Sequence, residues 1–260
     1  MGNAKKQQKR GKKPLAQNIY DNDVFFREYT ALRRREENYN NLLEQPAMAR
    51  LLPEVKGLRV IDLGCGYGAN CMDFVRRGAA GVTGVDVSQN MLRMAAETNS
   101  HEKICYLKME LAGLSDLKET FDFAYSSLAF HYVQDFSKLC RDIFTLLSDG
   151  GYLLFSQEHP IITASKNGAG HYNKDKNGKE ISYTFSDYSQ SGRRESFWFV
   201  EGVEEYHRSI GQILTALARA GFWIETVEEP VPDAAALKKM PQLQKEWIKP
   251  TFLIVKARKC

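Results

Sequence analysis

"VIDLGCGYG" (residues 60–68) begins as an apolar strand and runs directly into three alternating glycines, Gly64, Gly66 and Gly68. A strand, a glycine-rich turn and a helix N-terminus form a general device for holding nucleotides, because missing side chains let backbone N–H groups approach a ligand closely. The spacing differs from G-x-G-x-x-G, which is typical of dinucleotide-binding turns. Asp62 lies two residues before Gly64, and we expect its carboxylate to face the path of the ligand. A carboxylate there repels a pyrophosphate and attracts a ligand with an ammonium and a sulfonium group.

Strands and helices alternate on both sides of this turn. The hydrophobic patterns predict strands at residues 58–63, 81–87, 103–109, 121–130 and 152–156, and helices at residues 69–77, 89–98 and 136–147. This alternation is typical of a parallel sheet with helices on both faces, the doubly wound α/β class.

The two ends of the chain and one long segment depart from the alternation. Residues 20–50 are predicted to be helical, with Pro46 and Pro53 as breakers. Residues 157–206 contain eight aromatic residues and several glycines, and we interpret them as an insertion that covers the acceptor as a lid. An amphipathic helix that ends at Gly221 follows. Two last strands come after it, separated by a Pro-containing segment and not by a long crossover helix, so these two strands can be antiparallel.

The composition, 43% hydrophobic and 26% charged over 260 residues, is typical of a globular protein. The sequence contains neither a run of eighteen apolar residues nor an apolar leader, so we expect a cytoplasmic protein without a membrane span. The five cysteines show no C-x-x-C spacing, which favours reduced thiols and no metal site.

The net charge of +4 is unevenly distributed. Residues 1–14 hold six basic residues and no acidic one, so the remaining chain carries −2. We expect residues 1–18 to be a disordered basic tail and residues 19–260 to form one domain. A slightly acidic domain disfavours nucleic acid as a partner, although the tail leaves a weak role in RNA or membrane-surface binding open.

Downstream residues extend the candidate ligand site. Asp86 ends the second predicted strand, where an acidic residue accepts hydrogen bonds from the vicinal hydroxyls of a ribose. Val87 and Met91 supply apolar surface beside it, and Glu110 follows the third strand, where it can accept a hydrogen bond from an adenine amino group. These residues together fit an adenosine.

Five motifs in order carry a family resemblance: "VIDLGCGYG", "VTGVDVSQNML", "LKMELAGL", "FDFAYSSLAFHYV" and "LLSDGGYLLFS". With them the chain resembles the class I S-adenosylmethionine-dependent methyltransferases, and most closely the small-molecule branch that includes ubiquinone and menaquinone biosynthesis enzymes. The resemblance implies a Rossmann-like, seven-stranded mixed sheet of order 3-2-1-4-5-7-6, with helices at residues 19–56 as an N-terminal cover.

The resemblance also implies roles for particular residues around S-adenosylmethionine. It implies that Gly64, Gly66 and Gly68 line the cofactor, that Asp62 lies near its amino group, and that Ser127 or Ser126 lies below its methionine part. Leu111 and Glu110 belong to the adenine side, although the family usually has Asp where this chain has Glu110. Tyr29 and Arg34 resemble a pair that folds over the cofactor, with the arginine holding its carboxylate; the alternative is a solvated basic face.

Methyl transfer by in-line displacement depends mainly on positioning, and a base is needed only where the acceptor must lose a proton. The candidate bases are His131, His159 and His207, the first two at the ends of predicted parallel strands. A small molecule is the expected acceptor, because the N/D-P-P-Y loop of base-methylating enzymes is absent after the fourth strand. An RNA or protein acceptor, a nicotinamide-dependent oxidoreductase and a binding protein without catalysis remain alternatives. The sequence does not indicate the oligomeric state.

Overall fold

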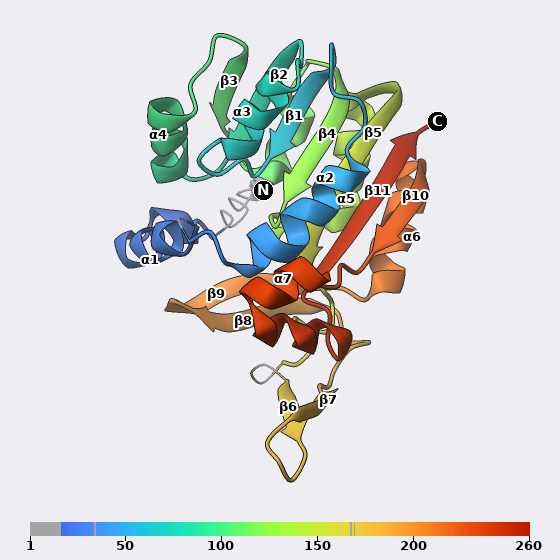
Figure 1. Cartoon of the computed structure of the whole chain (residues 1–260). Coiled ribbons are helices and arrows are strands. Elements are labelled where there is room, and N and C mark those ends of the chain that lie inside the picture. The colour runs from blue at the N-terminus through green and yellow to red at the C-terminus, as the bar shows by residue number, and fades with distance from the viewer. Residues whose placement is uncertain (1–16, 34, 167, 169) are drawn as a thin grey trace, which may run out of the picture.

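The computed structural model describes residues 17–33, 35–166, 168 and 170–260. Its centre is a seven-stranded sheet (Figure 1) in the order β10-β11-β5-β4-β1-β2-β3. Counted along the sheet-forming strands, this is the predicted order 3-2-1-4-5-7-6, so the doubly wound fold class is confirmed. Residues 1–16 of the predicted tail, and Arg34, lie outside the described residues.

Five parallel strands form most of the sheet: β1 (Arg59–Leu63), β2 (Gly81–Asp86), β3 (Ile104–Lys108), β4 (Phe121–Ser127) and β5 (Leu147–Glu158). The last strand, β11 (Phe252–Lys259), is antiparallel both to β5 and to β10 (Phe222–Glu228). The antiparallel final pair, which the sequence left open, is therefore present.

Helices cover both faces because residues of each strand alternate between the faces. Ile61 and Leu63 pack in the core formed with α5 (Phe136–Leu146) and α6 (Ile210–Ala220). Val60 lies in the other core, with α2 (Gln45–Leu51) and α3 (Ala69–Arg76). The remaining sheet helix, α4 (Gln89–Thr98), follows β2 and matches its predicted bounds. The sheet is thus buried on both faces, as parallel sheets require.

Several local predictions need correction. Pro46 does not break a helix but stands in the first turn of α2, where its missing N–H costs no hydrogen bond. The fourth strand ends at Ser127, and a short 3-10 helix, η4 (Phe130–Tyr132), follows it. The segment between β10 and β11 contains two helices that the sequence patterns did not predict, α7 (Ala234–Lys239) and η5 (Pro241–Trp247). A third unpredicted piece, η3 (Leu111–Asp116), follows β3.

The predicted insertion folds into two β-hairpins. The first pairs β6 (His171–Lys174) with β7 (Glu180–Thr184) and projects away from the sheet (Figure 1). The second pairs β8 (Gly192–Trp198) with β9 (Val200–His207) and runs across the carboxyl ends of the parallel strands.

The chain before β1 adds the helix α1 (Asp23–Arg33), preceded by the 3-10 turn η1 (Ile19–Asp21), and the π-helical turn η2 (Asn40–Glu44) before α2. Within the described part of the chain, none of the helices combines the length and the apolar character needed to cross a bilayer.

Candidate functional site

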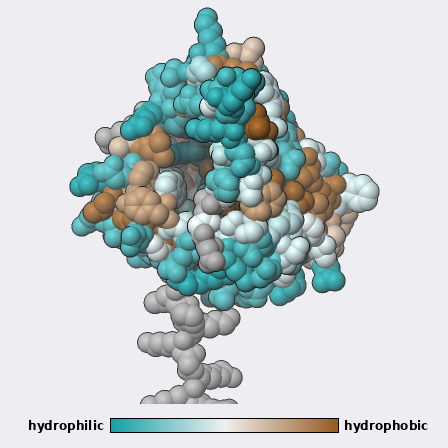
Figure 2. Space-filling model, turned by 90° about the horizontal axis from the view of Figure 1, so that it is seen from below, coloured by the Kyte–Doolittle hydropathy of each residue, from teal (hydrophilic) through white to brown (hydrophobic). Residues whose placement is uncertain are grey.

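A cavity of about 1300 Å³ lies at the carboxyl ends of the parallel strands. Open α/β sheets bind their ligands at this edge. The turn after β1, the end of β2, η3, η4, the N-terminal segment and the β8–β9 hairpin all contribute to its lining. In the space-filling view, the molecule is hollowed on the face seen from below (Figure 2).

The glycine turn borders the cavity with two of its three glycines, Gly64 and Gly66. A Cβ on Gly66, whose φ is +55°, would enter open space, so a ligand can approach the backbone there. Gly68 is not among the lining residues. A Cβ on it would lie 2.1 Å from Oη of Tyr106, so this glycine serves the packing of α3 on the sheet and not, as predicted, the lining of the site.

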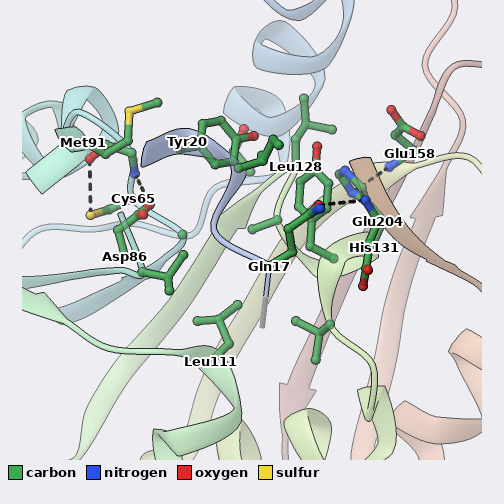
Figure 3. Close-up of a pocket in the computed structure, with 18 of the residues that line it drawn as sticks. Gln17, Tyr20, Cys65, Asp86, Met91, Leu111, Leu128, His131, Glu158 and Glu204 are labelled. Atoms are coloured by element: carbon green, nitrogen blue, oxygen red, sulfur yellow. Dashed lines mark hydrogen bonds between the residues drawn. The ribbon is translucent and has the colours of Figure 1, made fainter. Parts of the chain in front are cut away.

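Asp86 is buried and supports the turn. Its Oδ2 accepts a hydrogen bond of 2.9 Å from the N–H of Gly66, and its Oδ1 one of 2.8 Å from the N–H of Ser88. Burial raises the pKa of Asp86. The predicted neighbours also line the cavity: Val87, Met91, Glu110 and Leu111. In the close-up, Asp86, Met91 and Leu111 lie in one half of the cavity (Figure 3).

Asp62 corrects a prediction. It does not face the cavity: its side chain shares a face of β1 with Val60, because residues two apart in a strand point the same way. The Cys71 thiol of α3 donates to Asp62 Oδ2 at 3.3 Å, and Oδ1 has no hydrogen-bond partner among the described residues. Burial, with the nearby charge of Asp86, raises the pKa of Asp62 to about 7.

An arginine does line the cavity from α1, but it is Arg33; the predicted Arg34 lies outside the described residues. Nε and Nη1 of Arg33 are buried and have no hydrogen-bond partner among the described residues. Although burial opposes its charge, Tyr29, Tyr67 and Glu44 raise the pKa of Arg33. Tyr29 lines the cavity as well, and a helix places residues four apart on one face. That spacing was the signal in the sequence for Arg33.

Ser127 lines the cavity and belongs to a buried network that the sequence analysis missed. Its Oγ donates to Glu44 Oε1 at 2.8 Å, and Ser156 Oγ donates to the same oxygen at 2.5 Å. Gln45 Nε2 donates to the other carboxylate oxygen at 2.7 Å. Burial raises the pKa of Glu44. No sequence motif marks Glu44, because its partners come from β4 and β5, more than eighty residues away.

Of the three candidate bases, only His131 lines the cavity. Burial and the charge of Arg208 lower its pKa to about 3, so the ring is neutral at ordinary pH. His159 and His207 are buried away from the lining, which corrects the prediction that they face the acceptor. Nε2 of His159 lies 2.7 Å from Glu229 Oε1, beyond the end of β10.

His207 holds the insertion together. Its Nε2 donates to the Tyr188 carbonyl at 2.8 Å, so the hydroxyl of Thr163 donates to its Nδ1 at 2.9 Å. Sequence position alone could not separate these two structural histidines from a cavity residue.

The cavity is also lined by residues that the sequence analysis did not single out: Tyr20, Tyr132, Glu158, Arg193, Trp198, Glu204 and Tyr206. The ring of Tyr29 is in edge contact with two other rings. Its centroid lies 5.1 Å from that of Tyr20 and 5.8 Å from that of Trp198. Of the predicted insertion, the β8–β9 hairpin thus reaches the cavity, whereas no described residue of the β6–β7 hairpin lines it.

The N-terminal segment is fastened over the cavity at two points. The amide of Gln17 donates to the Gly202 carbonyl at 2.6 Å and accepts from the N–H of Glu204 at 2.8 Å (Figure 3). The carboxylate of Asp21 accepts from Ser88 Oγ at 2.6 Å and from the N–H of Asn90 at 3.0 Å, at the start of α4. Gln17 therefore contacts the folded domain inside the range predicted as tail.

Comparison with known proteins agrees with this architecture. The family model of a methyltransferase domain matches residues 61–155. The crystal structure of an S-adenosylmethionine-dependent methyltransferase from Mesorhizobium loti is 40% identical, has a TM-score of 0.77, and is aligned over 83% of this chain and 97% of that chain. An uncharacterized protein of Haemophilus influenzae is 37% identical over 253 residues, which are 93% of this chain and 96% of that protein.

A shorter match is the juvenile hormone acid O-methyltransferase of Bombyx mori, 32% identical over 114 residues and 41% of each chain. The strand order, the glycine turn beside Asp86 and the matches over nearly the whole length agree with one another. The chain belongs to the class I S-adenosylmethionine-dependent methyltransferases, enzymes whose methyl donor is S-adenosylmethionine.

Proposed function

We propose that the protein transfers the methyl group of S-adenosylmethionine to a small molecule bound in the same cavity. The observation that carries this proposal is the continuous cavity of about 1300 Å³ that joins the glycine turn to the aromatic residues of η4 and the β8–β9 hairpin. Single-ligand pockets usually measure roughly 300–1000 Å³. The volume therefore suits a cofactor together with a small acceptor.

The side chains of one half fit the cofactor. The buried Nε and Nη1 of Arg33, which have no hydrogen-bond partner among the described residues, suit the carboxylate of the cofactor's methionine part. Asp86 suits the ribose hydroxyls, and Met91 and Leu111 offer apolar surface for the adenine. Ser127, whose hydroxyl donates a hydrogen bond to Glu44, lines the cavity at the end of β4, which lies between β1 and β5 in the sheet.

The bound cofactor supplies a methyl group activated by a positively charged sulfur. The chain's own residues orient the acceptor and exclude water. The aromatic side chains of the N-terminal segment and the β8–β9 hairpin cover part of the cavity. His131 lines the cavity with a neutral ring. It offers hydrogen bonds to the acceptor and does not serve as a strong base.

A small acceptor is favoured over RNA or protein because the cover fastened through Gln17 and Asp21 leaves a partly enclosed space. The Bombyx mori relative, whose name states a hormone acid as its substrate, supports the same class. The basic arm that would bind RNA lies outside the described residues.

The proposal is tested by incubating the protein with metabolite extract and S-adenosylmethionine that carries an isotope-labelled methyl group. Mass spectrometry is expected to find the label in a small metabolite, and Asp86→Ala is expected to abolish its appearance. Asp116→Ala, at an exposed site on η3, is the matched control. Label that enters only RNA or protein contradicts the small-molecule acceptor, and absence of S-adenosylmethionine binding in calorimetry contradicts the proposed activity.

A further inference from the structure

We propose that Glu158 binds the methyl acceptor through an N–H or O–H group and accepts the proton that this group loses on methylation. The inference rests on the proposed function and narrows its substrate: the acceptor is an amine or a hydroxyl compound, and not a carboxylate.

The position of Glu158 places it on the acceptor side. It is the last residue of β5, whereas the glycine turn follows β1, and β4 lies between these two strands. The adenosine half of the cavity extends the other way, over β2 and β3. Figure 3 shows Glu158 and His131 in the half opposite to Asp86 and Met91.

Glu158 has a carboxylate oxygen beside this space that is unpartnered among the described residues. The residue lines the cavity, and its Oε2 is buried without a hydrogen-bond partner in the part of the chain that the structure describes. Buried polar atoms are nearly always partnered, and an exception needs an explanation. A donor group on the acceptor molecule provides the missing partner.

The cations of the cavity are already engaged. Arg33 suits the cofactor, Lys138 lies 2.5 Å from Asp142 Oδ2, and Arg193 lies 2.6 Å from Glu204 Oε1. Among the described lining residues, these are the lysine and arginine side chains that a carboxylate acceptor would use. Among the described lining residues, no unengaged lysine or arginine would then compensate an anion beside the like charge of Glu158. Lys249, which is not a lining residue, already faces Glu158 itself.

The surroundings of Glu158 suit proton transfer. Groups from three elements or loops face it: Glu205 on β9, Tyr132 and His131 on η4, and Lys249 after η5. Burial, followed by the charge of Glu205, raises the pKa of Glu158 well above its ordinary value, and Lys249 opposes this rise. His131, with its pKa near 3, is a much weaker base.

The step balances without a further reactant. The N–H or O–H bond of the acceptor breaks, and its proton passes to the Glu158 carboxylate. The electron pair left on nitrogen or oxygen forms the bond to the methyl carbon, whose bond to sulfur breaks with its electrons remaining on sulfur.

The first test determines the chemical class of the acceptor with the unmodified protein. A library of amines, phenols, alcohols and carboxylic acids is incubated with labelled S-adenosylmethionine, and the products are identified by mass spectrometry. Methylated amines or methyl ethers are the expected products, and these two outcomes distinguish the nitrogen from the oxygen acceptor. A methyl ester as the main product would overturn the inference while leaving the methyltransferase activity in place.

The second test uses Glu158→Gln, with Glu201→Gln as an exposed control on β9. Glu158→Gln is expected to bind S-adenosylhomocysteine within twofold of the unmodified protein, to bind the acceptor found in the library roughly tenfold more weakly, and to lose the acidic limb of the kcat profile. Calorimetry of acceptor binding to the S-adenosylhomocysteine complex in two buffers also counts the protons exchanged. A Glu158→Gln variant that keeps both the acceptor affinity and the acidic limb would refute the role of Glu158. If the unmodified protein does not bind S-adenosylhomocysteine, the proposed function itself is refuted.

Discussion

At the scale of single residues, Asp62 and Arg33 show how burial and partners set the role of a charged group. Asp62 stands next to the glycine motif in the sequence but is turned into the core beneath the turn. Arg33 belongs to no recognisable motif but brings two free N–H groups to the cavity. We therefore propose Arg33, and not Asp62, as the residue that binds a charged group of the cofactor, namely its carboxylate.

Replacement of Arg33 by Met is expected to weaken S-adenosylhomocysteine binding by roughly 10- to 100-fold, since hydrogen bonds to charged groups contribute about 1.5–3 kcal/mol each. Isothermal titration calorimetry measures the change in Kd. The control is Arg35→Met, because Arg35 is exposed and does not line the cavity. Equal affinities in the two variants would show that Arg33 does not hold the cofactor carboxylate.

Asp62 makes the stability of the fold depend on pH. Its pKa is about 7 in the folded chain and about 3.9 when unfolded, so the folded state binds the proton more tightly. The contribution is fully present below pH 4 and is lost as the pH rises through 7, by about 4 kcal/mol at most. Asp62→Asn is expected to be more stable relative to the unmodified protein at pH 7.5 than at pH 4.5.

Urea unfolding at both pH values measures this difference, with Asp116→Asn as the exposed control. If the stability difference between Asp62→Asn and the unmodified protein is the same at pH 4.5 and 7.5, the raised pKa of Asp62 is contradicted.

At the scale of elements, two segments far apart in the sequence form the cover of the cavity. The N-terminal segment meets the β8–β9 hairpin through Gln17, and α1 meets the same hairpin through the edge contact of Phe25 with Trp198 at 5.2 Å. Asp21 attaches the segment to the start of α4, where a carboxylate also interacts favourably with the helix dipole. Both segments line the cavity and contact each other, so the cover is built from the two together.

Gln17→Ala removes both hydrogen bonds between the segment and β9. Each bond contributes about 1 kcal/mol, so the dissociation rate of S-adenosylhomocysteine is expected to rise by about fivefold or more. Stopped-flow fluorescence measures this rate. Gln244→Ala, an exposed position on η5, provides the comparison, and an unchanged rate in Gln17→Ala would mean that the segment does not retain the cofactor.

At the scale of the whole molecule, the strand order divides the cavity. β2 and β3 lie on one side of β1 and carry the half of the cavity proposed for the adenosine. β4 and β5 lie on the other side and carry Ser127, His131 and Glu158 near their ends. One reversal of strand order thus brings the cofactor and acceptor halves to a common edge.

Cofactor binding is expected to slow hydrogen exchange in residues 17–33 and 192–207, because ordering the cover reduces local opening. The β6–β7 hairpin, at residues 171–184, projects away from the cavity and is expected to exchange unchanged. Exchange measured by mass spectrometry with and without S-adenosylhomocysteine tests both expectations. Equal protection of the two hairpins would indicate a global stabilisation and not closure of the cover.

The sequence by itself determined the sheet, its strand order through the family resemblance, and the half of the site that follows directly on a strand. Gly64, Gly66, Asp86 and Glu110 could be located because each stands at a strand end, and parallel strands bring their carboxyl ends to one edge. Hydrophobic periodicity predicts such elements from local sequence.

Only the tertiary structure decided which polar side chains reach the cavity. Glu44 accepts hydrogen bonds from serines on two distant strands. The electrostatic environment of Glu158 comes from groups on η4, β9 and the loop after η5. The three histidines differ in burial and partners, and neither property is present in the local sequence. The physical reason is that burial and electrostatic environment arise from contacts between segments far apart in the chain, whereas strand and helix patterns arise from neighbours.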